Sequence, residues 1–326
     1  MGAEPARFRD RSITFANGAS GQNLDIPSAN PVNYHQAISR PAEMAPVTID
    51  GKLFLPPGAS RGKPLPLVMV VPGSLGVAPS HVAHAEAITD AGIAAFVLDP
   101  FAARGVGSTV TNQTQYSFAA SAYDVLAAWK VLAARGDIDP ARIGAQGHSR
   151  GGSAVLTAAT RRLADAVVGA GKGLRSVLAA YPWSGHQFLD PSVGRTEIRV
   201  LMGDRDDWCS PMQVQGHVQA IRLAGGTATM RLFAGVSHSF DRGTPIQRIA
   251  DAAVSPAAPT AYVANDGAFI HPLHDAPDPA LKDRDLMVYG LKAGYGMKGA
   301  TIGTRGEEAG LFRTDMIAFW RRTLLG

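Results

Sequence analysis

The chain has 326 residues, of which 46% are hydrophobic and 18% are charged, as expected of a globular protein with a substantial core. Its formal net charge is +4, but no run of lysines and arginines supports nucleic-acid binding. The one cysteine, Cys209, excludes an intrachain disulfide. Because the N-terminus lacks the apolar core of a signal peptide and no apolar run could span a membrane, we expect a soluble, cytoplasmic protein that binds neither membranes nor nucleic acid.

The first part of the chain predicts little regular structure. Residues 1–46 are rich in Pro, Asn, Gly and Ser, and only residues 12–15 alternate like a strand. We therefore predict a largely irregular N-terminal extension over residues 1–46, followed by a main domain over residues 47–326. Residues 47–55 alternate again, and Asp50-Gly51 in their middle fits either a hairpin turn or a bulge.

Short apolar runs then alternate with helix-forming segments. The predicted buried strands are residues 65–71, 94–98, 143–146, 174–181, 198–202 and 228–233. The predicted helices are residues 80–91, 117–134, 153–168 and 213–223. This alternation predicts an α/β fold with a mostly parallel central sheet and helices on both faces.

Residues 241–305 fit this alternation poorly, because Pro, Ala, Gly and Asp dominate them. We predict a loop-rich insertion there, which would be a cap over the site, an interface or a plain surface excursion. A closing amphipathic helix is predicted over residues 307–325. Its core candidates are Leu311, Met316, Ile317, Phe319 and Trp320.

The most informative stretch is Gly147-His148-Ser149-Arg150-Gly151, a G-x-S-x-G pentapeptide between a predicted strand and a predicted helix. In a nucleophile elbow the serine occupies a strained turn, and the glycines let strand and helix approach each other. The start of the helix then offers N–H groups to a developing oxyanion. A chance match is the alternative in a chain with 36 glycines.

A serine nucleophile needs a base, and the base needs an acid that holds it in one tautomer. Asp204, Asp206 and Asp207 follow the predicted strand at residues 198–202, and His238 follows the strand at residues 228–233. The order serine, acid, histidine is that of α/β-hydrolases. At this point any of the three aspartates could be the acid or a solvated loop charge, and His238 could be a structural histidine.

An oxyanion hole requires two backbone N–H donors. The residue after the nucleophile, Arg150, would supply one. The glycine-rich loop at residues 72–76 would supply the other, at Ser74 or Leu75, unless this loop is only a turn.

Histidines elsewhere could indicate a metal site. His81 and His84 share a helix face, but Glu86 does not face His81 and no further ligand is evident. His271 and His274 lie in the irregular insertion. We predict neither a metal nor another cofactor.

Taken together, these motifs resemble the dienelactone hydrolase family of the α/β-hydrolase superfamily over residues 47–242 and the closing helix. Residues 147–152 look like the family's elbow. The run Gly203-x-x-Asp206-Asp207-Trp208 resembles its acid motif, in which the first aspartate is catalytic, and this favours Asp206. His238-Ser239-Phe240 resembles its histidine motif. The resemblance implies Ser149 as nucleophile, Asp206 as acid and His238 as base.

Two departures from the family pattern matter. Dienelactone hydrolase itself uses a cysteine nucleophile and a glutamate in the oxyanion loop, where this chain has Ser149 and Gly73. The resemblance therefore implies a serine esterase or lactonase that acts on a small molecule through an acyl-enzyme. A serine peptidase or amidase with the same triad, and a non-catalytic homologue that only binds a ligand, are the alternatives.

The resemblance also bears on the substrate. Arg242 stands four residues beyond His238, where the family has a carboxylate-binding arginine, and Arg104 lies near the place of a second one. An anionic ester or lactone is one hypothesis, and a surface or salt-bridging role for these arginines is the other. Further substrate-binding candidates are Leu75, His148 and Trp183. The sequence leaves the oligomeric state open, a homodimer included.

Overall fold

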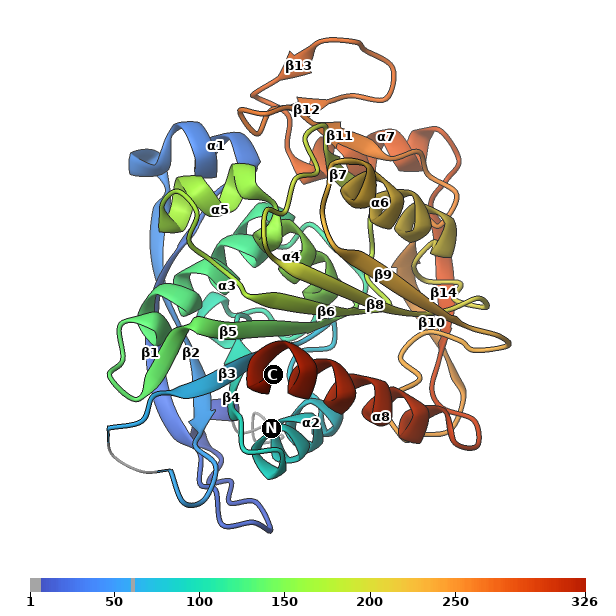
Figure 1. Cartoon of the computed structure of the whole chain (residues 1–326). Coiled ribbons are helices and arrows are strands. Elements are labelled where there is room, and N and C mark those ends of the chain that lie inside the picture. The colour runs from blue at the N-terminus through green and yellow to red at the C-terminus, as the bar shows by residue number, and fades with distance from the viewer. Residues whose placement is uncertain (1–6, 60–61) are drawn as a thin grey trace, which may run out of the picture.

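The computed structural model describes residues 7–59 and 62–326. An eight-stranded sheet crosses the molecule in the order β1-β2-β4-β3-β5-β6-β8-β9 (Figure 1). Its strands are β1 (Gln22–Asn30), β2 (Ala45–Phe54), β3 (Leu65–Val71), β4 (Ala94–Asp99), β5 (Ile138–His148), β6 (Ser176–Ala180), β8 (Glu197–Gly203) and β9 (Ala228–Phe233). From β4 to β9 all neighbours are parallel, whereas β2 is antiparallel to both β1 and β4.

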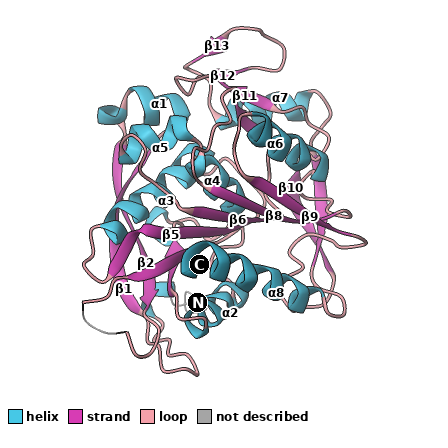
Figure 2. Ribbon diagram, in the orientation of Figure 1, coloured by secondary structure: helices cyan, strands magenta, loops and turns pink. Residues whose placement is uncertain are grey.

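Helices cover both faces of this sheet (Figure 2). On one face lie α2 (Pro79–Asp90) and α8 (Glu308–Trp320). On the other lie α3 (Phe118–Ala133), α4 (Arg150–Ala159), α5 (Arg161–Val168) and α6 (Pro211–Leu223). Strands β4 and β6 are therefore buried along their whole length, which explains why the sequence shows them as continuous apolar runs. The structure confirms the predicted mostly parallel sheet.

The N-terminal part is more regular than predicted. Residues 22–30 form edge strand β1, which pairs with β2 from Gln22 opposite Leu53 to Asn30 opposite Ala45. Helix α1 (Tyr34–Ser39) follows, capped by the Asn33 side chain. The sequence hides β1 because Pro27 and several polar residues lower its strand propensity. An edge strand tolerates a proline, since one of its sides makes no ladder hydrogen bonds.

Strand β2 runs without a break through Asp50-Gly51, so neither a hairpin turn nor a bulge occurs there. The glycine is needed for packing, because a Cβ at Gly51 would lie 2.4 Å from the Phe96 ring and 2.5 Å from the Val97 oxygen. The ring of Phe96 thus fills the space that a side chain at position 51 would take.

The Gly51→Ala variant should consequently lose stability, by about 1–3 kcal/mol as typical of an overpacked core. Gly136→Ala is the matched control, because a Cβ at Gly136 meets no atom within 4 Å. Urea denaturation of both variants measures the difference. Equal stability of the two variants would contradict this account of Gly51.

The insertion at residues 241–305 is also more regular than predicted. Strand β10 (Gln247–Val254) pairs with β14 (Met297–Ile302). A second small sheet contains β7 (His186–Phe188), β11 (Ala261–Val263), β12 (Phe269–Ile270) and β13 (Pro277–Asp278). Helix α7 (Asp283–Lys292) lies between β13 and β14 in the chain (Figure 1). Strands of two or three residues, one of them paired with distant β7, show no periodicity that sequence patterns could reveal.

The closing helix α8 buries Phe312, Met316, Phe319 and Trp320. These residues recur at the spacing of one helix face, and Leu311 falls outside it. The prediction that Leu311 belongs to the core is wrong, because its side chain is 43% exposed. The Trp320 ring lies against Gly144 of β5, and its Nε1 donates to Gln146 Oε1 at 3.0 Å.

Within residues 7–59 and 62–326, every helix is too short or too polar to span a lipid bilayer.

Candidate active site

Ser149 lies in a tight turn between β5 and α4. Its φ is 54°, which a non-glycine residue rarely adopts. The glycines on either side permit the turn: a Cβ at Gly147 would lie 2.0 Å from the Gly151 oxygen, and one at Gly151 would lie 2.3 Å from the Val71 oxygen. The Ser149 N–H donates to the Ala180 oxygen at 2.9 Å. This is the geometry of a nucleophile elbow.

The structure brings the three predicted catalytic residues together at the carboxyl ends of β5, β8 and β9. His238 Nε2 lies 2.9 Å from Ser149 Oγ, and His238 Nδ1 lies 2.7 Å from Asp206 Oδ2. The other carboxylate oxygen of Asp206 accepts the N–H groups of Trp208 and Cys209 at 2.9 and 2.8 Å. All three side chains are buried, so the orientation of the imidazole is set by protein groups.

The two neighbouring aspartates point elsewhere. Asp204 accepts the Gly235 N–H at 2.6 Å, and Asp207 accepts the N–H and hydroxyl of Thr301 at 2.8 and 3.0 Å. Both contacts join loops rather than reaching His238. Among the three aspartates that the sequence left open, the geometry therefore selects Asp206.

The two predicted oxyanion donors border the same cavity as Ser149. Arg150 is the first residue of α4, where a backbone N–H has no partner within the helix. The Ser74 loop is held in place, since the Ser74 carbonyl accepts the Thr109 N–H at 2.9 Å and the Ser108 hydroxyl at 3.0 Å. The alternative donor, Leu75, has a side chain that is 41% exposed.

The side chain of Arg150 has a separate role that the sequence did not indicate. Its guanidinium donates to the carbonyls of Gln113 and Tyr116, both at 2.7 Å. It also lies over the rings of Phe118 and Tyr116, at 4.1 and 4.5 Å from their centroids. These contacts fix the start of α4 against the loop before α3. They therefore also fix the position of the Arg150 backbone N–H.

A cavity of about 360 Å³ opens from Ser149. Its walls come from the elbow, from the segment after β6 and from the insertion. The aromatic side chains in these walls are Phe118, Trp183, Trp208 and Tyr289. The insertion contributes, among others, Val254, Ala261, Leu286 and Met297. Residues of the insertion thus border the same cavity as Ser149, and Trp183 also lines it.

Two polar residues of the cavity wall were missed by sequence reasoning. His186 of β7 and Asp283 of α7 have side chains that are only 7% and 5% exposed, and their Nδ1 and Oδ1 atoms are 4.0 Å apart. Burial lowers the pKa of His186 to about 3 and raises the pKa of Asp283 to about 6. No sequence signal could find this pair, because its partners are brought together only by the small sheet and α7.

The comparison with family models decides the relationship of this chain to known proteins. The model described as the dienelactone hydrolase family matches residues 49–263. The chain belongs to the dienelactone hydrolase family. This confirms the resemblance found in the elbow, acid and histidine motifs, and it supports a hydrolase. A search of curated proteins finds no match.

Solved structures show the same fold. The dienelactone hydrolase-like promiscuous phosphotriesterase P91, from metagenomic libraries, is 13% identical with a TM-score of 0.53, and the alignment covers 94% of this chain and 99% of that one. The structure titled m3DLH is 17% identical with a TM-score of 0.52, and covers 68% of this chain and 85% of its own. At such identities the likeness shows the α/β-hydrolase fold alone.

In this member of the dienelactone hydrolase family, Gly73 packs tightly against the elbow. A Cβ there would lie 3.0 Å from the His148 oxygen and 3.2 Å from the Ser149 Cβ. Any larger residue would therefore press on the elbow. A glutamate here, as in dienelactone hydrolase itself, would require the elbow to shift by a few tenths of an ångström.

His148 supports the elbow from behind and does not line the main cavity. Trp320 donates to Gln146 Oε1, which fixes the orientation of the Gln146 amide group. The amide nitrogen of Gln146 therefore donates to His84 Nδ1 at 3.1 Å and to His148 Nε2 at 3.2 Å. Burial lowers the pKa of both histidines and keeps the rings neutral. Asp241 lies 3.6 Å from each ring. Because the Gln146 N–H groups point at the ring nitrogens that a metal ion would need, they disfavour a cation between the two rings.

The other metal candidates also diverge. His81 Nδ1 accepts the Ala78 N–H at 2.9 Å, and Glu86 accepts the Ala16 N–H at 2.8 Å. The rings of His271 and His274 lie 5.1 Å apart at an angle of 45°, outside the main cavity. Each of these side chains has a local structural partner instead of a shared centre.

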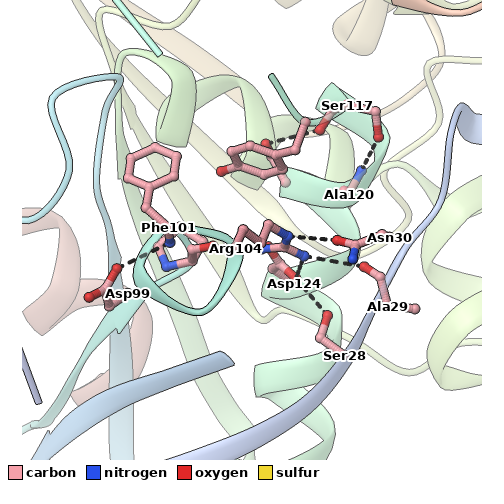
Figure 3. A network of polar contacts seen from close by, with 12 residues as sticks. Ser28, Ala29, Asn30, Asp99, Phe101, Arg104, Ser117, Ala120 and Asp124 are labelled. Atoms are coloured by element: carbon pink, nitrogen blue, oxygen red, sulfur yellow. Dashed lines mark hydrogen bonds and ion pairs between the residues drawn. The ribbon is translucent and has the colours of Figure 1, made fainter. Parts of the chain in front are cut away.

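Arg104 does not lie where the substrate hypothesis needs it. Its guanidinium binds both carboxylate oxygens of Asp124, at 2.7 and 2.9 Å, and its Nε donates to Asn30 at 2.6 Å (Figure 3). Asp124 also accepts the Ser28 hydroxyl, so this buried ion pair joins β1 to α3. Arg242, with Leu75 and His148, borders a smaller hollow beside Ser149. The structure thus gives Arg104 a structural role.

Replacing Asp283 should reveal the cost of its burial. The usual pKa of an aspartate is about 3.9, and the folded protein raises it to about 6, so the folded state holds the proton more tightly. Stability contributed by this residue is therefore present below about pH 4 and is lost as the pH rises to about 6. The wild type should lose about 3 kcal/mol over this range relative to Asp283→Asn. Urea denaturation at several pH values measures this, and parallel pH profiles would contradict it.

Removing Arg104 should damage the fold and leave specificity unchanged. Arg104→Met leaves the buried Asp124 carboxylate without its partner, which typically costs about 3–5 kcal/mol. The double variant Arg104→Met/Asp124→Leu should regain much of this loss, because no buried charge remains. Thermal denaturation tests stability, and the ratio of kcat/KM for carboxylate-bearing and neutral esters tests specificity. A changed ratio in the folded double variant would show instead that Arg104 takes part in substrate binding.

Proposed function

We propose that this chain is a serine hydrolase that cleaves carboxylic esters or lactones through an acyl-enzyme. The observation that carries the proposal is the continuous chain of hydrogen bonds from Ser149 through His238 to Asp206, with distances of 2.9 and 2.7 Å. A buried serine, histidine and aspartate in this arrangement can activate the hydroxyl group for attack.

In the first half of the reaction Ser149 Oγ attacks the ester carbonyl carbon while His238 Nε2 takes its proton. Asp206 accepts the hydrogen bond of Nδ1–H and stabilises the imidazolium. The carbonyl oxygen becomes an oxyanion, which the N–H groups of Arg150 and Ser74 stabilise. Removing one such donor typically costs about 10²–10³ in kcat. His238 then protonates the leaving oxygen as the carbon–oxygen bond breaks, and an alcohol departs.

The second half repeats these steps with water. His238 removes a proton from water, and the hydroxide oxygen attacks the acyl carbon. The second oxyanion collapses, Ser149 Oγ leaves with the proton from His238, and the carboxylic acid is released. With a lactone the alcohol and acid remain in one molecule, so the same steps open a ring.

The cavity supports a small-molecule substrate. Its volume of about 360 Å³ lies in the usual range of ligand pockets. Arg242 borders the smaller hollow next to Ser149 and His238, and a carboxylate on the substrate would find its partner there. Amides and phosphotriesters present other electrophilic centres to the same nucleophile. The structurally similar P91 is described as a promiscuous phosphotriesterase, so both classes belong in the substrate panel.

Ser149→Ala should abolish hydrolysis of p-nitrophenyl esters of increasing acyl length, because no other group takes the place of the nucleophile. The loss in kcat should reach about 10⁴-fold or more. Ser153→Ala is the matched control. It removes a hydroxyl one helical turn further along α4, which donates to the Trp183 carbonyl at 2.6 Å, and it should stay within about tenfold of wild type.

A phosphonate probe that reacts with active-site serines provides the second readout. It should label Ser149 in the wild type and in Ser153→Ala, and leave Ser149→Ala unlabelled. A Ser149→Ala protein with full esterase activity would sink the mechanism. Labelling without turnover of any ester, amide or phosphotriester would favour the binding-only alternative.

A further inference from the structure

His186 and Asp283 form a buried polar pair in the wall of the main cavity that the proposed triad does not use. Both side chains border the cavity and both are more than nine-tenths buried. Among the residues that the structure describes, neither His186 Nδ1 nor Asp283 Oδ1 has a hydrogen-bond partner. Unpartnered polar atoms in a protein interior cost stability, so a pair of them beside a cavity calls for a functional reason.

The surroundings fix how the imidazole is oriented. Four aromatic rings pack around it: those of Trp183 and Phe269 at 4.7 Å, Phe118 at 5.4 Å and Tyr34 at 6.0 Å between centroids. Its Nδ1 is fully enclosed and points toward the Asp283 carboxylate. The second ring nitrogen, Nε2, is therefore the one left to face the cavity.

The charge of Asp283 decides which nitrogen carries the hydrogen. Asp283 Oδ2 accepts the Phe118 N–H at 2.6 Å, and its Oδ1 faces His186 Nδ1. A carboxylate on that side favours the tautomer with the hydrogen on Nδ1. Since burial lowers the pKa of His186 to about 3, the ring is neutral near pH 7 and its Nε2 is a hydrogen-bond acceptor.

We infer that His186, with Asp283 favouring one tautomer through its charge at 4.0 Å, forms a subsite that accepts a hydrogen bond from a hydroxyl group on the substrate. This inference rests on the proposed ester hydrolase function and names its substrate class: esters or lactones with a flat apolar body that bears a hydroxyl group. The rings of Phe118 and Trp183, 4.5 Å apart, flank the subsite and would contact that body.

Other ligand chemistries fit the pair less well. A carboxylate would meet the negative charge of Asp283. An ammonium group would lose its hydration in an apolar cavity and would find a neutral imidazole as its first contact. A hydroxyl group carries no charge and needs only one acceptor, so it suits the single acceptor nitrogen that His186 offers.

The test compares three sets of phenylalkanoate esters with identical leaving groups, bearing a para-hydroxyl, para-methoxy or para-methyl group, at several alkyl lengths. For the length that reaches His186, wild type should prefer hydroxyl over methyl by about fivefold in kcat/KM, since a hydrogen bond of this kind is worth about 1 kcal/mol. His186→Leu should bring this ratio near one, and His186→Gln, which can keep an acceptor, should restore part of it. His274→Leu, outside the cavity, should keep the wild-type ratio.

Asp283→Asn is the sharper variant. The asparagine oxygen would keep the Phe118 N–H, so its amide N–H would face His186 Nδ1 and turn that atom into an acceptor. Nε2 would then carry the hydrogen and donate into the cavity. The preference for hydroxyl over methoxy should consequently fall, because a methoxy oxygen only accepts hydrogen bonds. A merely structural role of Asp283 would lower turnover of all three esters together and leave their ratios unchanged.

Phosphonate labelling of Ser149 shows which variants keep an intact site, and Asp283→Asn carries the test if His186→Leu does not fold. Wild type that hydrolyses hydroxyl and methyl esters equally at every length would overturn the inference while leaving the ester hydrolase intact. Absence of ester turnover and of labelling at Ser149 in the wild type would overturn the proposed function itself, and this inference with it.

Discussion

The close approach of the β5–α4 turn to the end of β3 is the constraint on which the whole site depends. A side chain at Gly147 or Gly151 would collide with backbone carbonyl oxygens, so only glycine fits at these two positions. That approach holds Ser149 at a positive φ and starts α4 at Arg150. Because the sheet is packed on both faces, the nucleophile and the N–H group that would stabilise the oxyanion keep one relative position.

The insertion contacts His238 and the loop that carries Asp206, and it also lines the cavity beside Ser149. Strand β14 ends at Ile302, which forms a bridge with His238, and the Gly303 N–H donates to the His238 carbonyl at 3.1 Å. Thr301 meanwhile binds Asp207, next to the triad acid. The segment that walls the cavity therefore also holds His238 and the loop of Asp206 in place. A change in the packing of the insertion would reach the chemistry through these contacts.

Prediction from the sequence succeeded where the signal is local and failed where it is not. The buried strands were recognisable because a parallel sheet covered on both sides demands unbroken apolar runs, as in residues 65–71. Strand β1 was missed because its stability comes from pairing with β2, with little help from its own residues. The choice of Leu311 as a core residue failed because helix α8 turns that side chain outward.

The sequence by itself determined the family and the sheet, and it predicted a triad of Ser149, Asp206 and His238, because the elbow, acid and histidine motifs each lie within a few residues at a strand end. Tertiary structure alone decided the shape and chemistry of the cavity. His186 and Asp283 meet across nearly a hundred residues of chain, and Arg104 is bound by Asp124 on a different element. Such contacts depend on how separate elements pack, and no local pattern of residue types records that packing.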